Sequence, residues 1–128
     1  MASQFGLDAS VIHRIRETLA GFPEIRRAVL YGSRAKGDFR PGSDIDLTLD
    51  TEGDTSLGFL YRVMEAIEEL DLIYSFDISL FAHIENENLI EHIERVGVAF
   101  YHAETFAAEQ AEKGRRLIYS EQSYQSEA

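Results

Sequence analysis

The sequence predicts a mixed α/β domain, because helical and strand patterns alternate along it. Apolar residues recur at helical spacing from Leu7 to Leu19, which is typical of an amphipathic helix. An almost continuous apolar run covers residues 28–31, and apolar and acidic residues then alternate from Asp44 to Asp50. These patterns predict a small β-sheet with helices packed on it.

Length and composition indicate one ordinary globular domain. The chain has 128 residues and a net charge of −11, from 23 acidic and 12 basic side chains. That charge argues against binding to nucleic-acid backbones and suits a basic protein partner. The absence of cysteine excludes disulfides and cysteine-bound zinc. No apolar run approaches the roughly 20 residues of a membrane span and no signal segment is visible, so we expect a cytoplasmic protein.

The first half of the chain is predicted to run from one helix through two strands to a second helix. Residues 1–6 show no pattern, and Gly21 with Pro23 ends the first helix. The predicted elements are a helix that carries the stripe from Leu7 to Leu19 and is capped by Asp8 or Ser10, a strand over 25–31, a helical turn over 33–36, a strand over 44–50 and a helix over 56–70. In the last helix we expect one apolar face to fill the core: Leu57, Leu60, Tyr61, Met64 and Ile67.

The second half continues the alternation of strands and helices. The predicted elements are a strand over residues 73–81, a helix that starts near Asn86 or Asn88 and ends at Gly97, a strand over 98–101 and a weak helix over 105–117. After Tyr119 the chain is rich in Ser, Gln and Glu, which is typical of a flexible tail. We therefore predict a main domain over residues 1–103, and a C-terminal helix with a flexible tail over 104–128.

Two aspartates one residue apart are the first candidate metal ligands. Side chains alternate faces along a strand, so Asp44 and Asp46 point the same way, while Ile45 and Leu47 point toward the core. Neighbouring carboxylates repel one another, and Mg²⁺ relieves that repulsion because it prefers oxygen ligands. The alternative is a strand face exposed to solvent. Without other evidence, an Asp-x-Asp pair on a strand is more often such a face than a metal site.

A third carboxylate, Asp77, lies in the middle of a predicted strand, where aspartate is disfavoured. It is either exposed on an edge strand or placed on the same sheet face as Asp44 and Asp46. We favour the second arrangement, because three converging carboxylates could hold two metal ions.

A turn after the first strand suggests a phosphate site. Gly32 would let the backbone approach a ligand closely, and Ser33 adds a hydroxyl donor at the start of a helical turn. Arg34 and Lys36 are further candidates for phosphate contact, although exposed basic residues at helix starts are common. With Ser43 these residues form the predicted nucleotide-binding set; an ordinary turn is the alternative.

The run GSRAKGDFRPGSDIDL, with Gly32-Ser33 followed after ten residues by Asp44-Ile45-Asp46, resembles the signature of the nucleotidyltransferase superfamily that includes DNA polymerase β. It is similar to the minimal nucleotidyltransferases (MNT), and residues 76–101 also look like the second half of that family. The resemblance implies the nucleotidyltransferase fold and two Mg²⁺ ions held by Asp44, Asp46 and Asp77, which would be the catalytic residues. It also implies ATP as substrate, with phosphates contacted by Gly32 and Ser33.

The same resemblance implies a biological role. MNT proteins commonly act as antitoxins paired with a helical HEPN toxin, and members of the family transfer AMP from ATP to a tyrosine of that toxin. We therefore expect a HEPN-type partner to supply the acceptor, and we expect no direct binding of nucleic acid or membrane. The sequence leaves open whether the protein forms a homo-oligomer.

Two other functions compete with this prediction. One is a non-catalytic antitoxin whose acidic surface covers a basic toxin. The other is a nucleotidyltransferase that acts on a small hydroxyl compound, which the lack of an added helical domain disfavours. A P-loop kinase is excluded, because the sequence lacks the Gly-x-x-x-x-Gly-Lys-Ser/Thr pattern. Histidine spacing does not favour a zinc site.

Overall fold

A four-stranded mixed sheet forms the centre of the protein. The computed structural model describes residues 3–126, and the side chains of residues 3–116. The strand order is β5-β4-β3-β6, where β5 is Phe76–Leu80, β4 is Ile45–Thr51, β3 is Ile25–Tyr31 and β6 is Val98–His102. Strand β3 runs antiparallel to both its neighbours, whereas β4 and β5 are parallel. The predicted mixed sheet with packed helices is therefore confirmed.

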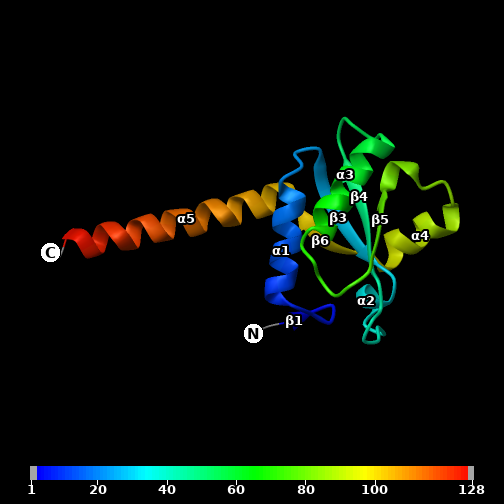
Figure 1. Ribbon diagram of the computed structural model, residues 1–128, viewed down its shortest axis with the longest axis horizontal. Helices are drawn as coiled ribbons and strands as arrows, with labels where there is room; N and C mark the ends of the chain where they lie inside the picture. Colours follow the sequence, from blue (N-terminus) through cyan, green and yellow to red (C-terminus); the bar gives the residue numbers. More distant parts are fainter. Residues whose placement is uncertain (1–2, 127–128) are drawn as a thin grey trace.

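Two helices cover one face of this sheet, and a third lies on the other (Figure 1). Helices α1 (Ala9–Ala20) and α3 (Leu57–Glu68) enclose the apolar core, which includes residues from β3 and β4. Helix α4 (Glu87–Val96) packs on the opposite face, and its start is capped by the Asn86 side chain. A side chain at Gly97, directly after α4, would collide with Val29 of β3. We call the sheet face that carries Val29 the open face, because α4 covers only part of it.

The N-terminal residues fold differently from the prediction. Residues 1–6 were expected to lack structure, but β1 (Ser3–Gln4) and β2 (Leu7–Asp8) form a small antiparallel hairpin. Its two turn residues, Phe5 and Gly6, both have positive φ. The hairpin is too short to leave a periodic pattern, which explains why the sequence did not predict it.

The buried face of α3 also differs from the prediction. Tyr61 and Met64 were expected to fill the core, yet they are 59% and 39% exposed. Phe59, Val63 and Ile67 are buried instead. These three residues are spaced four apart along the helix, so the core face is rotated from the predicted one. Of the predicted residues, Ile67 is buried and Leu60 is partly buried against the core. Strand β5 is likewise shorter than predicted.

The C-terminal helix is longer than predicted. Helix α5 runs over Ala103–Ser126 and projects from the rest of the protein, where a weak helix over residues 105–117 and a flexible tail were expected (Figure 1). Its first turns pack on the body through Phe106, which is buried. Between residues 107 and 116 the Ala, Glu, Lys and Arg side chains are exposed and favour helix, and Glu112 pairs with Arg116 at 3.1 Å. Residues 127–128 lie outside the described residues.

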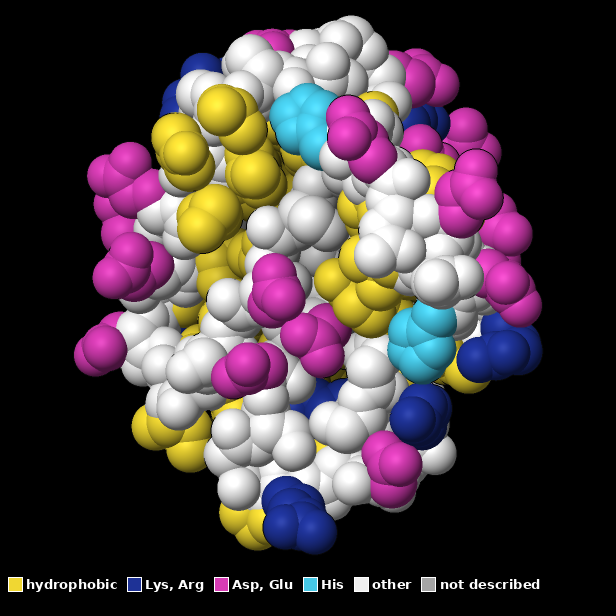
Figure 2. All heavy atoms as spheres, turned by 90° about the vertical axis from the view of Figure 1, so that its right-hand side faces the viewer, with side chains coloured by type: hydrophobic (Ala, Val, Ile, Leu, Met, Phe, Trp, Pro, Cys, Tyr) yellow, Lys and Arg dark blue, Asp and Glu magenta, His cyan; other side chains and the backbone are white. Residues whose placement is uncertain are grey.

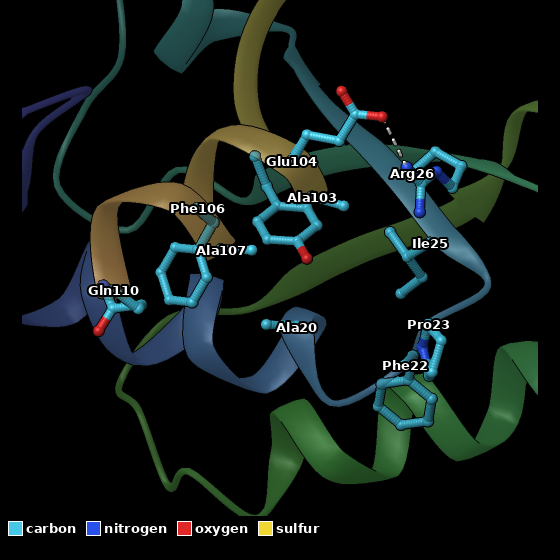
Figure 3. A pocket seen from close by; sticks show the side chains of 11 residues that line it. Ala20, Phe22, Pro23, Ile25, Arg26, Ala103, Glu104, Phe106, Ala107 and Gln110 are labelled. Atoms are coloured by element: carbon cyan, nitrogen blue, oxygen red, sulfur yellow. Dashed lines mark hydrogen bonds and ion pairs between the residues drawn. The ribbon is translucent and has the colours of Figure 1, made fainter. Parts of the chain in front are cut away.

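One pocket of about 450 Å³ lies on the side of the sheet that α1 and α3 cover (Figure 3). Ala20 of α1, Ile25 of β3 and Phe106 of α5 line it, and an ion pair of 3.2 Å joins Arg26 to Glu104 at its edge. Ile25 and Phe106 belong to the buried core, so the sheet separates this pocket from the open face. Among the helices of residues 3–126, none has the length and hydrophobicity needed to cross a bilayer.

Candidate active site

Strand register brings two of the predicted carboxylates together on the open face. Asp46 of β4 and Asp77 of β5 are direct partners in the parallel pair, so both side chains point to the same face. Asp44 lies directly before β4, two residues from Asp46. Figure 2 views the side of the molecule that carries α4, and acidic side chains gather near its centre. Asp77 is exposed on an edge strand, as in the first arrangement considered for it, and it also shares the sheet face of Asp46.

The electrostatics of Asp46 show how close these charges are. Burial raises the pKa of Asp46, and the carboxylates of Asp77 and then Asp44 raise it further, while Arg34 acts in the opposite direction. Each effect has a plain cause, because partial desolvation and like charges both disfavour the ionised form. A cation bound here would relieve the repulsion from Asp77 and Asp44 and stabilise the ionised form of Asp46.

The donor set fits a magnesium ion bound together with a nucleotide. Among the residues that the structure describes, no three His, Asp or Glu side chains are arranged to hold a metal by themselves. Magnesium in nucleotide sites needs fewer protein ligands, because it is usually held by one or two carboxylates, phosphate oxygens and waters. The Asp46–Asp77 pair supplies hard oxygen ligands of that kind, and Asp44 adds a third nearby carboxylate.

Gly32 lies directly against the Asp46 carboxylate. It precedes α2 (Ser33–Lys36) and has φ +78° and ψ −158°, a conformation that other residues rarely adopt. A Cβ atom at this position would collide with Oδ2 of Asp46. Glycine is therefore required here on two counts: the backbone conformation and the room for the carboxylate. Ser33 follows as the first residue of α2, at the same end of the sheet.

Arg34 has a different position from the one predicted. It was a candidate for phosphate contact, but it is only 3% exposed. Its guanidinium donates two hydrogen bonds to the Ser43 carbonyl, at 3.1 and 2.9 Å, and one to the Phe5 carbonyl at 2.9 Å. It also lies 5.3 Å from the ring centroid of Phe39 and 5.1 Å from that of Tyr74. Arg34 thus ties the N-terminal hairpin to the loop before β4.

Replacing Arg34 tests this structural role. We expect Arg34→Met to lower the free energy of unfolding by about 2–4 kcal/mol, because two partly buried carbonyls lose their charged donor. Lys36→Met is the control, since the Lys36 side chain is 45% exposed and its ion pair with Asp38 is long, at 3.9 Å. Urea unfolding of both variants measures the difference. Equal stabilities for the two variants would contradict the structural role of Arg34.

The remaining predicted nucleotide residues surround the same loop. Lys36 is exposed at the end of α2, where its ammonium could reach a ligand in solution. The Ser43 hydroxyl accepts a 2.9 Å hydrogen bond from the Arg40 backbone, so it stabilises the loop that leads to Asp44. Lys36 is therefore accessible, whereas both the hydroxyl and the carbonyl of Ser43 are already engaged.

Tyr31 is a residue at the site that the sequence reasoning missed. It is the direct partner of Asp46 in the β3–β4 pair, and its hydroxyl lies within hydrogen-bonding reach of Ser79. Burial raises the pKa of Tyr31, and the charges of Asp77 and Asp46 raise it further, so the phenol stays protonated. The sequence signal that could have identified Tyr31 is its position as the last residue of the strand, directly before Gly32.

The raised pKa of Asp46 predicts how stability depends on pH. The folded protein binds this proton more tightly than the unfolded chain, so stability falls as pH rises from the ordinary value of 3.8 through the raised folded value. We expect Asp46→Asn to be more stable than the wild type at neutral pH. The stabilities of the two proteins should converge at about pH 3, where Asp46 of the wild type is neutral in the folded and the unfolded state. Urea midpoints across this range measure the effect, and a constant difference would contradict it.

Comparisons with known proteins give the following. The sequence model of the family described as "Polymerase beta, Nucleotidyltransferase" matches residues 13–106. That segment contains Gly32, Ser33 and all three candidate carboxylates. No curated protein matches the chain.

Solved structures share the fold. A toxin–antitoxin crystal structure with AMP-PNP has a TM-score of 0.58 at 18% identity, covering 88% of this chain and 93% of that chain. A structure of the toxin–antitoxin MntA-HepT has a TM-score of 0.55 at 16% identity, covering 91% and 94%. A structure from Shewanella oneidensis has a TM-score of 0.52 at 13% identity, also covering 91% and 94%. At these identities the likeness shows a common fold.

Proposed function

Because the chain belongs to the polymerase β nucleotidyltransferase family, we propose that it transfers AMP from ATP to a hydroxyl group of a partner protein. The observation that carries this proposal is the β4–β5 register, which pairs Asp46 with Asp77 while Gly32 lies against the Asp46 carboxylate. Carboxylates beside a glycine-serine turn supply both a metal site and a phosphate site within one small area.

The residues of the site fall into three groups by their role in the proposed reaction: metal ligands, phosphate-binding residues and a hydrogen-bond donor. Asp44, Asp46 and Asp77 would hold the Mg²⁺ ions. When bound, Mg²⁺ would lower the pKa of the acceptor hydroxyl and offset charge on the leaving pyrophosphate. The turn at Gly32 and Ser33 binds the β- and γ-phosphates, and the exposed Lys36 ammonium approaches them. Tyr31 stays protonated and can donate a hydrogen bond toward the reacting phosphate.

The bond changes follow from an in-line displacement. The acceptor oxygen forms a bond to the α-phosphorus, and the bond from that phosphorus to the bridging oxygen breaks. The electron pair leaves with pyrophosphate. Asp77 accepts the acceptor's proton and passes it to water, because it is exposed and lies at the edge of the sheet.

We further propose that the partner is a HEPN-type toxin and that the acceptor is one of its tyrosines. The structural neighbours described as toxin–antitoxin complexes support this choice, as one of them was solved with AMP-PNP. The net charge of −11 suits a basic partner.

Incubation with α-labelled ATP, Mg²⁺ and the cognate partner tests the proposal. We expect label on the partner, and we expect it to vanish in the Asp44→Ala, Asp46→Ala double variant. If the double variant still neutralises the toxin, the chain acts as a non-catalytic antitoxin that works by direct contact. If label appears only on a small hydroxyl compound, the acceptor class is wrong.

A further inference from the structure

We propose that a groove between α4 and the open face of the sheet receives the acceptor tyrosine of the partner. This inference rests on the proposed function and adds the place where the acceptor binds. The groove has a volume of about 360 Å³. We call it the α4 groove, and its walls are formed by Val29, Thr48, Phe81, Ile93, Gly97 and Ala99.

The α4 groove lies next to the carboxylate site on the open face of the sheet. Thr48 follows Asp46 by two residues in β4, so it shares the open face and lies about 7 Å farther along the strand. Val29 is the direct partner of Thr48, just as Tyr31 is the direct partner of Asp46. Ser79, the partner of Thr48 in β5, donates a 3.1 Å hydrogen bond to the Thr48 hydroxyl. The groove therefore begins one strand repeat from the reacting centre.

The direction of the groove matches the geometry of in-line transfer. Gly32 and Ser33 lie beyond Tyr31 at one end of the strands, whereas Val29 and Thr48 lie on the other side of Asp46. With pyrophosphate at the glycine-serine turn, the attacking oxygen must approach from the opposite side of the α-phosphorus. That side is the α4 groove. The nucleoside leaves the α-phosphorus in another direction, so the in-line approach to that phosphorus stays open for the acceptor.

The lining suits one aromatic hydroxyl side chain. Val29, Phe81 and Ile93 supply apolar contacts for a ring. A volume of 360 Å³ is at the lower end of ligand pockets, which span roughly 300–1,000 Å³. It therefore suits a single side chain better than a compound with several rings, and so favours a protein acceptor.

The rim of the α4 groove indicates what flanks the acceptor. Arg27, Asp50 and Glu94 lie around it, and Arg27 approaches Asp50 to 3.4 Å. This pairing offsets one acidic charge, and Glu94 leaves the rim acidic overall. Together with the net charge of −11, this favours a segment of the partner that carries basic residues beside its tyrosine. The phenolic oxygen of that tyrosine forms the new bond to the α-phosphorus, and its proton passes to Asp77.

Filling the α4 groove tests the inference on the full chain. Ala99 is exposed on β6 and lines the groove, so Ala99→Leu narrows it. The control is Ala108→Leu, at an exposed alanine of α5. The probe is N-acetyl-L-tyrosinamide with ATP and Mg²⁺. We expect Ala99→Leu to raise the KM for the probe about 10-fold or more and to leave the KM for ATP within about twofold. Phe81→Ala is a second variant with the same expectation, from loss of ring contacts.

Binding is also measured without turnover, by NMR titration of the labelled wild type with the probe. We expect amide shifts at Val29, Ile93 and Ala99, and we expect them to be lost in Ala99→Leu. Shifts confined to other residues would overturn the α4 groove. Transfer by the wild type with unchanged probe KM in both groove variants would also overturn it, while the proposed function stands. A wild type that forms no pyrophosphate, even with the partner, would overturn the proposed function and the groove with it.

Discussion

Asp77→Asn is expected to lower the rate of AMP transfer by about a thousand-fold, because a metal ligand supplies several kcal/mol of transition-state stabilisation and each 1.4 kcal/mol is tenfold in rate. The substitution removes one negative charge and changes the shape of the side chain very little. Asp77 is exposed on an edge strand, so we expect the unfolding temperature to stay close to that of the wild type. Loss of transfer in a stable protein would then reflect chemistry and not folding.

A matched control separates this effect from a general loss of charge. Asp71 is also exposed, and its φ of +53° is a conformation that asparagine accepts. Asp71→Asn should therefore keep both stability and transfer. Initial rates of pyrophosphate release with saturating ATP and partner provide the comparison. If Asp77→Asn stays within about threefold of Asp71→Asn, the proposed role of the third carboxylate fails.

Magnesium binding gives a second measure of the same site. A ligand that binds only the folded state stabilises it, by about 2.7 kcal/mol at a hundred times its dissociation constant. We expect ATP with Mg²⁺ to raise the unfolding temperature of the wild type and to raise it less in Asp77→Asn. This measurement requires no acceptor. It therefore tests the metal site even where the identity of the partner is in question.

The parts of the fold that the sequence predicted well are those with strong local signals. Strand β3 was predicted with its observed bounds, and β4 within one residue, because central strands carry long apolar patterns. Helix α4 was also predicted closely, since Asn86 caps its start and Gly97 follows its end. The shared face of Asp46 and Asp77 was predicted from polar alternation and the family resemblance together.

The parts that the sequence did not predict depend on contacts between distant residues. Arg34 binds the Phe5 carbonyl, 29 positions earlier, and nothing near Arg34 in the sequence signals that partner. The role of Tyr31 depends on its register with Asp46, which only the assembled sheet defines. The rotation of α3 has a similar origin, because Tyr61 and Phe59 are both aromatic and only packing decides which is buried. The α4 groove, too, arises only when α4 lies across the sheet.

Gly32→Ala is the second substitution for which we expect a large effect, because it strains the backbone and displaces a carboxylate at once. The φ of +78° with ψ of −158° is reached almost only by glycine, and holding another residue there costs about 1–3 kcal/mol. The added Cβ atom would also occupy the space of Oδ2 of Asp46, so that carboxylate must move. A displacement of about 1 Å can reduce catalysis a hundred-fold, and we expect a loss of at least that size.

Gly53→Ala isolates the catalytic part of this effect. Gly53 has a φ of +87°, but a Cβ atom there would meet nothing within 4 Å. Both variants should therefore lose stability in urea unfolding, whereas only Gly32→Ala should lose transfer activity. If the two variants lost stability to a similar extent and kept equal transfer rates, the close approach of Gly32 would have no part in positioning Asp46. Retained magnesium-dependent stabilisation in Gly32→Ala would point the same way, since a displaced Asp46 carboxylate should weaken the metal site as well.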